Sequence, residues 1–243
     1  MLCVLKLCVL KLCVLSIRAQ GIENCNHVIP MGRLPMRTVD SAPGARLDLA
    51  VLVPARRSCV AVDLATNAVL RVHHPRQDYI APFTVVRANV SESTHDRLEQ
   101  PESIDVSETL QPIGRIMGLR CERLLRSIDN GLNRPTLGFV GPGISLWELD
   151  GSRPSVEIIR APHGATLTVD ERGVRLRFAW LHGLEDLPIE DVRLLRRLDW
   201  LPSGPLTFRD IAPALGYRPT RFAVALSRPK QGYCYKVIAA LLP

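Results

Sequence analysis

The feature that most constrains the fold is a two-residue alternation in the stretch VRLRFAWL. From Val174 to Trp180, a hydrophobic residue stands at every second position. Successive side chains of a strand point to opposite faces, so this pattern predicts a half-buried strand with Phe178 and Trp180 on its core face. The preceding residues 170–173, Asp-Glu-Arg-Gly, have turn composition and predict a hairpin with a strand at 166–169.

Strand patterns recur along the rest of the chain. Residues 47–72 are expected to form successive strands, with further strands at 83–90 and 156–160. The C-terminal residues 221–242 predict a hairpin with its loop at 228–232. The polar stretch 91–112 has no clear period and is expected to be an exposed loop. The predicted fold class is therefore mainly β, a β-rich α+β chain.

One substantial helix is predicted over residues 113–128, where the hydrophobic residues share one side of a helical wheel. Asp129, Asn130 and Gly131 follow it and are typical of a helix end. A short second helix is expected near 189–198.

The N-terminal stretch LCVLKLCVLKLCVL, residues 2–15, is a repeated pentad. Lys6 and Lys11 break its hydrophobic runs, which argues against both a secretory signal and a membrane-spanning helix. A period of five also matches neither a helix nor a strand. We therefore expect a non-native or disordered extension and a native start at Met31 or Met36, with an unusual secretory signal as the alternative.

Setting residues 1–30 aside changes the charge and the cysteine count. This segment contains three basic residues and one acidic residue, so the formal net charge falls from +7 to +5. Cys59, Cys121 and Cys234 remain, widely spaced, and do not form a disulfide framework. They predict a reducing, cytoplasmic environment, and the interrupted N-terminal repeat predicts no membrane association.

No motif predicts catalysis, a cofactor or a metal site. The glycine-rich stretch 138–143 lacks the Lys-Ser/Thr pair of a phosphate-binding loop. His73 and His74 suggest a metal site with His95 or Asp78, but neighbours on a strand point to opposite faces. The chain is expected to be a binding module, with enzymatic activity left open.

Residues 207–228 are similar to the second helix-turn-helix of AraC-type regulators. Pro213 would lie inside the first helix of that motif, and proline there costs about 3 kcal/mol. The stretch FAVALS, at 222–227, also favours a strand over a recognition helix. DNA binding by a helix-turn-helix is therefore the less favoured alternative.

Basic residues on the predicted strands, with aromatic residues nearby, suggest contacts to nucleic acid. The candidate phosphate-binding residues are Arg56, Arg57, Arg71, Arg175, Arg177 and Lys236. Tyr233 and Tyr235 are the candidate base-stacking residues, whereas Phe178 and Trp180 are expected to fill the core. Arginine is also an ordinary solvent-facing residue of a sheet, so a purely structural role is the alternative.

Four stretches together resemble the uncharacterised dual OB-containing domain family of bacterial conflict-related proteins. They are SCVAVDLATNAVLRVHHP, PFTVVRANV with EQPESI, VRLRFAWLHGLEDLPIED and FAVALSRPKQGYCYKVIAALL, and the resemblance spans roughly residues 48–243. The family places a tryptophan before an Ile-Arg-Pro where this chain has Val69 to Val72. The resemblance implies two small OB-like β-barrels with a nucleic-acid or nucleotide role, and no catalytic residues.

These observations give an expected organisation. After the extension at 1–30, we expect a linker at 31–46, a first OB-like half with the helix at 47–128, a turn-rich connector at 129–153 and a second OB-like half at 154–243. The expected function is binding of single-stranded nucleic acid or a nucleotide through a basic β face. The alternative is a protein-interaction or assembly component that uses sheet edges or the 91–112 loop.

Overall fold

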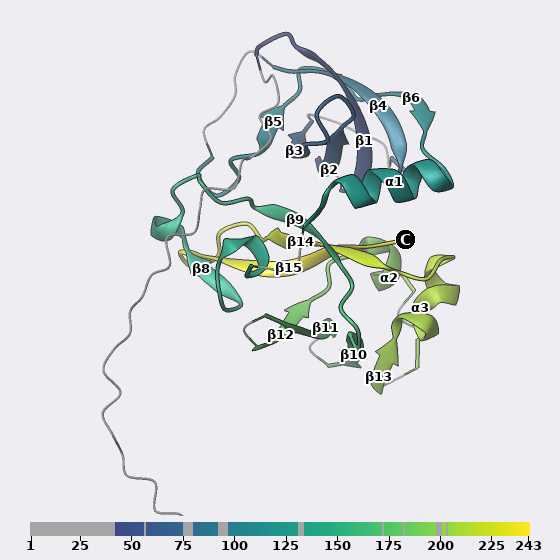
Figure 1. Ribbon diagram of the computed structural model, residues 1–243. Coiled ribbons are helices and arrows are strands. Elements are labelled where there is room, and N and C mark those ends of the chain that lie inside the picture. Colours follow the sequence, from purple (N-terminus) through teal and green to yellow (C-terminus); the bar gives the residue numbers. More distant parts are fainter. Residues whose placement is uncertain are drawn as a thin grey trace, which may run out of the picture. The chain divides into compact units, whose positions relative to one another are not determined.

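The computed structural model confirms that the chain is mainly β (Figure 1). It describes residues 42–55, 57–74, 80–91, 97–130, 134–171, 173–181, 183–197, 201–202 and 204–243. All of them belong to one compact unit, Arg33–Pro243. The expected extension and most of the expected linker lie outside the described residues. Within this part of the chain, no helix has the length and hydropathy needed to span a bilayer.

The first half of the unit contains one six-stranded sheet with the order β5-β3-β2-β1-β4-β6. Its strands are β1 (Arg46–Pro54), β2 (Ser58–Asp63), β3 (Val69–His73), β4 (Thr84–Asn89), β5 (Ser103–Asp105) and β6 (Gln111–Arg115). The strands predicted within 47–72 and 83–90 are therefore confirmed. Inside the expected loop at 91–112, however, the structure contains β5 and the start of β6.

The ends of β4 and β5 also meet, which makes the first sheet curl (Figure 1). Val90, just after β4, pairs with Val106, just after β5, and the Ser91 amide donates to the Asp105 carbonyl at 2.8 Å. β5 runs parallel to β3, whereas the other neighbouring strands of the sheet are antiparallel. Each strand therefore pairs with the next in the closed order β1-β2-β3-β5-β4-β1, hereafter a circuit.

The second half contains two sheets, with the orders β7-β9-β14-β15-β8 and β12-β11-β10-β13. The strands are β7 (Asp129–Asn130), β8 (Gly143–Ser145), β9 (Val156–Arg160), β10 (Thr166–Asp170), β11 (Gly173–Trp180), β12 (Gly183–Pro188), β13 (Gly204–Thr207), β14 (Arg221–Leu226) and β15 (Tyr233–Leu242). The helices are α1 (Leu119–Ser127), α2 (Val192–Leu195) and α3 (Phe208–Leu215), with the 3-10 turns η1 (Thr136–Gly138) and η2 (Leu146–Glu148). The alternating strand at 174–180, the C-terminal hairpin and the short second helix are confirmed.

The two sheets of the second half are joined by a parallel bridge between Ile189, just after β12, and Ile238 on β15. β9 pairs with β14, while β10, which follows β9 after a short break, pairs with β11. If β9 and β10 are taken as one interrupted strand, the circuit is β9/β10-β11-β12-β15-β14-β9. This is the same order as in the first half, with a parallel pair at the same place.

The alternation of side chains along β1 separates two hydrophobic cores. Leu49 and Val51 face the interior of the first half, while Ala50 and Leu52 face the second half. Against the latter pack buried residues of β9, β14 and β15, namely Ile158, Ala223, Ala240 and Leu242. Figure 1 accordingly shows β14 and β15 lying between the first sheet and strands β10 to β12. The halves share one core along this boundary.

The helix predicted at 113–128 is shorter than expected. Residues 111–115 form β6, and α1 begins at Leu119, after Gly118 with a positive φ of 57°. A left-handed residue interrupts helical geometry, so the two segments are separate. Leu124, Leu125 and Ile128 are buried as expected, whereas Ile113 is exposed.

The helix-turn-helix alternative is not supported by the local structure. A helix does form at 208–215 despite Pro213, because its buried residues Phe208, Ile211 and Ala214 anchor it. The proline argument was therefore wrong. The second helix of the motif is absent, since Arg221–Leu226 is the fully buried strand β14.

Candidate nucleic-acid interface

The eight predicted site residues have very different environments. Arg56 lies outside the described residues, and Arg57 is exposed in the turn between β1 and β2. Arg71 and Lys236 are largely buried, whereas Arg175 and Arg177 lie on the outer face of β11. Tyr233 and Tyr235 are exposed on β15.

Arg71 connects the two halves of the unit. Its guanidinium donates to the carbonyl oxygens of Ser155 and Leu226 at 2.8 and 2.9 Å and lies 3.5 Å from the Glu102 carboxylate. Glu102 in turn accepts hydrogen bonds from the amide and the hydroxyl of Ser155. With 16% of its side chain exposed and these partners in place, Arg71 is positioned for structure and not for phosphate contact.

Lys236 is also held inside the molecule. Its Nζ donates to the Phe139 carbonyl at 2.9 Å, lies 3.1 Å from Glu185 Oε1 and sits over the Phe139 ring. Burial lowers the pKa of this ammonium group, and the nearby Glu185 carboxylate opposes that shift. A direct contact between Lys236 and a surface phosphate is therefore incompatible with this geometry.

Arg175 and Arg177 share the carboxylate of Asp186 on the neighbouring strand β12. Arg175 Nε lies 2.9 Å from Asp186 Oδ1, and Arg177 Nη2 lies 3.6 Å from Oδ2. About half of the Arg177 side chain, 52%, remains exposed. The two arginines carry two positive charges and Asp186 carries one negative charge, so this part of the surface has a net charge of +1.

Three aromatic side chains form an exposed row beside these strands: Trp147, Tyr233 and Tyr235, hereafter the aromatic row. Their exposed fractions are 74%, 43% and 41%. The ring centroids of Trp147 and Tyr233 are 5.8 Å apart, and those of Tyr233 and Tyr235 are 6.4 Å apart. Single exposed hydrophobic residues are ordinary on a protein surface, whereas exposed apolar residues gathered in one large patch mark binding or interaction surfaces.

Local sequence places the row at the surface. Along β15, Cys234 points into the core, so Tyr233 and Tyr235 point outward. Tyr233 and Tyr235 pair with Ser145 and Gly143 of β8, and Trp147 follows β8 in η2. A Cβ at Gly143 would lie 2.9 Å from Tyr235 Cδ1, so glycine is required where this ring crosses the backbone.

The loop between β14 and β15 brings positive charge to the aromatic row. Arg228 and Lys230 are exposed in this loop. The amide and carbonyl of Lys230 exchange hydrogen bonds with those of Tyr233 at 2.7 and 3.1 Å. This tight turn holds the base of the loop against the first tyrosine of the row.

Trp147 was missed by sequence reasoning because it lies within the expected connector at 129–153. That segment contains β8 and both 3-10 turns, so it is part of the sheet that carries the tyrosines. An isolated tryptophan in a turn-rich stretch gives no periodic signal. The pairing of β8 with β15 is what brings it beside Tyr233.

A groove of about 300 Å³ is lined in part by Pro142, which precedes Gly143, the partner of Tyr235 in the β8–β15 pairing. One wall contains Val140, Gly141 and Pro142, which immediately precede β8, and the other contains Trp180 and residues 183–186. The Pro142 carbonyl accepts a hydrogen bond from the Lys236 amide, one residue beyond Tyr235. The groove therefore connects the aromatic row to Asp186 and its two arginines.

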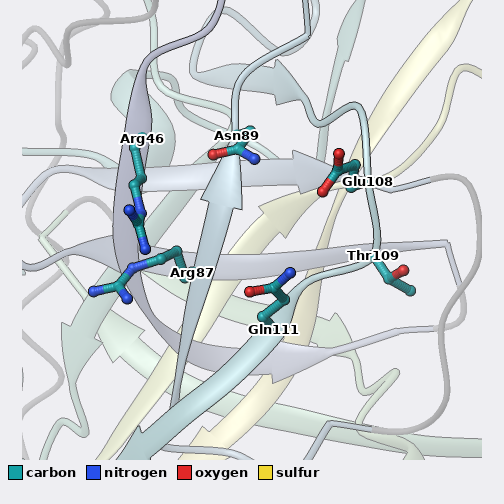
Figure 2. Close-up of a pocket in the computed structure, with 6 residues that line it drawn as sticks. All are labelled: Arg46, Arg87, Asn89, Glu108, Thr109 and Gln111. Atoms are coloured by element: carbon teal, nitrogen blue, oxygen red, sulfur yellow. The ribbon is translucent and has the colours of Figure 1, made fainter.

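A second, smaller hollow of about 120 Å³ lies on the outer face of the first half. Figure 2 shows Arg46 and Arg87 on one side of it and Glu108 across from them. The Arg87 guanidinium is directed away from Gln111 and binds both carboxylate oxygens of Asp48, at 2.8 and 3.1 Å. With one arginine neutralised and a carboxylate opposite, this hollow is less suited to a polyanion than the aromatic row.

Metal or thiol chemistry receives no support within the described ranges. No group of three His, Cys, Asp or Glu side chains there is placed to hold a metal ion. Asp78 and His95, the suggested partners of His73 and His74, lie outside those ranges. Cys59, Cys121 and Cys234 are free thiols, and burial raises the pKa of Cys59 to about 12.

Comparison with known proteins adds no assignment: no protein-family model matches the chain, and no curated protein or solved structure is significantly similar to it.

Proposed function

We propose that this protein binds single-stranded nucleic acid through the aromatic row of its second half. The observation that carries the proposal is the exposure of Trp147, Tyr233 and Tyr235 side by side. Aromatic side chains on a β surface stack on unpaired bases, and each stacked base contributes about 1–3 kcal/mol. A row of three rings provides such contacts without requiring a particular base.

The strand order supports an OB-like barrel in each half. An OB-fold is a five-stranded Greek-key barrel that binds oligonucleotides on the face of its second and third strands and through adjacent loops. The circuits β1-β2-β3-β5-β4-β1 and β9/β10-β11-β12-β15-β14-β9 are both consistent with that architecture. We therefore also propose that the chain belongs to the dual OB-containing domain family.

The two halves differ in which outer strand faces are exposed to solvent. On β2, Val60 and Val62 pack against the second half, so that the outer face of this strand is covered. In the second half, the strand that corresponds to β2 is β11, which carries Arg175 and Arg177 on its outer face. Binding is therefore expected on the second half.

Positive charges flank the aromatic row at both ends of the proposed path. Arg228 and Lys230 lie in the loop before Tyr233, and Arg177 lies 3.6 Å from Asp186, one of the residues that line the groove. These side chains are placed to contact the phosphates of a strand whose bases stack on the row.

The free thiols of Cys59 and Cys234 also support a reducing, cytoplasmic location.

A fluorescence-anisotropy titration with a labelled single-stranded oligonucleotide at low salt tests the proposal. The unmodified protein should bind, and Trp147→Ala should weaken binding about tenfold because one stacked base loses its platform. Leu119→Ala, which shortens a 77% exposed side chain at the start of α1, is the matched control and should leave binding unchanged. Absence of binding at low salt, or equal binding by Trp147→Ala, would refute the assignment.

The second candidate function is a protein-interaction component, and the edge strand β6 favours it. All five residues of β6 are exposed, and Met117 and Leu119 just beyond it are 68% and 77% exposed. Pro112 removes one backbone donor from this edge, which weakens it as a template for strand addition. A stoichiometric protein partner that is lost on Ile113→Lys, together with no oligonucleotide binding, would favour this candidate.

A further inference from the structure

The groove is lined by both apolar and acidic residues. Val140 and Leu184, each 65% exposed, and Pro142 provide apolar surface on both sides. Glu185 provides a carboxylate there, whereas Asp186, the next residue along β12, directs its carboxylate to Arg175 and Arg177 on the other face of the strand. A flat, apolar group that carries N–H donors on one edge complements this arrangement.

The carboxylates are held in place by buried or neighbouring cations. Glu185 Oε1 lies 3.1 Å from Lys236 Nζ, and 15% of the Glu185 side chain is exposed. Asp186 is held by Arg175 and Arg177. The Glu185–Lys236 pair is largely buried, and because a buried ion pair is costly to form, its presence beside a groove fits a positioning role.

Trp180, on the same wall as residues 183–186, is equally fixed. Trp180 is 9% exposed, and its Nε1 donates to the Arg134 carbonyl at 2.8 Å. Arg134 Nη2 lies 2.6 Å from the buried carboxylate of Glu157, which also accepts the Leu137 amide. The groove is therefore shaped by side chains with defined partners before any ligand enters.

Resting on the proposed function, we propose that this groove takes a nucleobase that carries an exocyclic amino group, so that the site discriminates against uracil and thymine. Cytosine presents an amino donor where uracil and thymine present a carbonyl acceptor. The donor can pair with the Glu185 carboxylate, whereas the carbonyl would face a like partial charge. The volume of about 300 Å³ is at the lower end of ordinary small-ligand sites and suits one base.

Continuity with the aromatic row favours a base over a basic peptide side chain. Tyr235 packs on Gly143, the residue after Pro142 of the groove wall. A strand stacked on the row thus reaches the groove with its next base. Arg177, beyond Asp186, is placed for the following phosphate.

Anisotropy titrations with oligo-dC and oligo-dU of equal length test the inference, because the two differ in their hydrogen-bonding edge and not in their backbone. Oligo-dC should bind roughly tenfold more tightly, in line with one well-placed base contact. Glu185→Gln should abolish most of this preference. Because that substitution also removes the partner of Lys236, Leu184→Ala provides a second test on an exposed residue, and it should weaken oligo-dC binding more than oligo-dU binding.

Leu181→Ala is the matched control, since Leu181 is 49% exposed and does not line the groove. Equal binding of both oligonucleotides, with Trp147→Ala still weakening each, would overturn the groove assignment and leave the proposed function in place. Absence of binding to either oligonucleotide would overturn both. Binding of an arginine-rich peptide in place of the oligonucleotides, weakened by Leu184→Ala, would assign the groove to a protein partner and also overturn both.

Discussion

Individual residues show how burial redirects charge in this protein. Arg71 and Lys236 both stand on strands among apolar neighbours, and the sequence suggested that they face a polyanion. In the structure their long side chains extend inward to carbonyl oxygens and to one carboxylate each. A buried cation without partners is costly, so such partners are a condition for its burial.

Arg71→Met should therefore destabilise the protein without a direct effect on the aromatic row. The variant leaves the carbonyls of Ser155 and Leu226 without this donor and leaves the Glu102 carboxylate, 8% exposed, without its cation. Breaking a buried pair of this kind costs about 3 kcal/mol. Urea denaturation measures the loss of free energy of unfolding.

Arg57 is exposed, so Arg57→Met provides the comparison for this experiment. It should change the free energy of unfolding by less than about 0.5 kcal/mol. A loss at Arg71 no larger than at Arg57 would mean that the contacts between the halves contribute little to stability.

At the scale of elements, helix α3 depends on its first turn. The Asp210 carboxylate accepts hydrogen bonds from the Thr207 amide at 2.8 Å and from the Thr207 hydroxyl at 2.7 Å. These bonds lower the pKa of Asp210 from its ordinary value of 3.8, with the Thr207 amide as the largest cause. A lowered pKa means that the ionised carboxylate is favoured in the folded state.

Asp210→Ala should consequently lower the melting temperature at neutral pH. The stabilisation by Asp210 is fully present above the ordinary pKa of 3.8 and is lost as pH falls through the lowered value in the folded state. The difference in melting temperature between the two proteins should therefore shrink below about pH 3.8. Glu171→Ala, at an exposed carboxylate in the turn before β11, serves as the control, and a pH-independent difference would contradict the assignment.

The sequence was most informative where side chains alternate. The strand at 174–180 and the burial of Phe178 and Trp180 follow from a two-residue period, whereas the C-terminal hairpin was predicted from its strand composition and the loop at 228–232. β12 was missed because Leu184 is exposed while the carboxylates beside it point toward partners on other strands, which disrupts the period. Of the candidate site, the two tyrosines could be proposed from sequence, whereas Trp147 and the groove depend on pairing between distant strands.

The whole unit is stabilised by a core that belongs to both halves. Ala50 and Leu52 of β1 are fully buried against Ile158 and Ala223 of the second half. Separating the halves would expose this surface, and burial of apolar surface contributes about 25 cal/mol per Å². The two halves are therefore expected to unfold together.

Hydrogen exchange followed by mass spectrometry can test this cooperativity. The slowest amides of β1 and of β14 should exchange with the same free energy of opening, because both require loss of the shared core. If peptides from the first half exchange through an opening of clearly lower free energy than peptides from β14, the halves unfold separately.

The central claim concerns the surface that the aromatic row forms. Ultraviolet cross-linking of the unmodified protein to a single-stranded oligonucleotide, followed by mass spectrometry of the digested complex, locates the contact directly. Cross-linked peptides are predicted to contain Trp147 and the segment 228–236, where the tyrosines and the basic loop lie. Cross-links confined to the first half, or none under conditions where binding is saturated, would contradict the account.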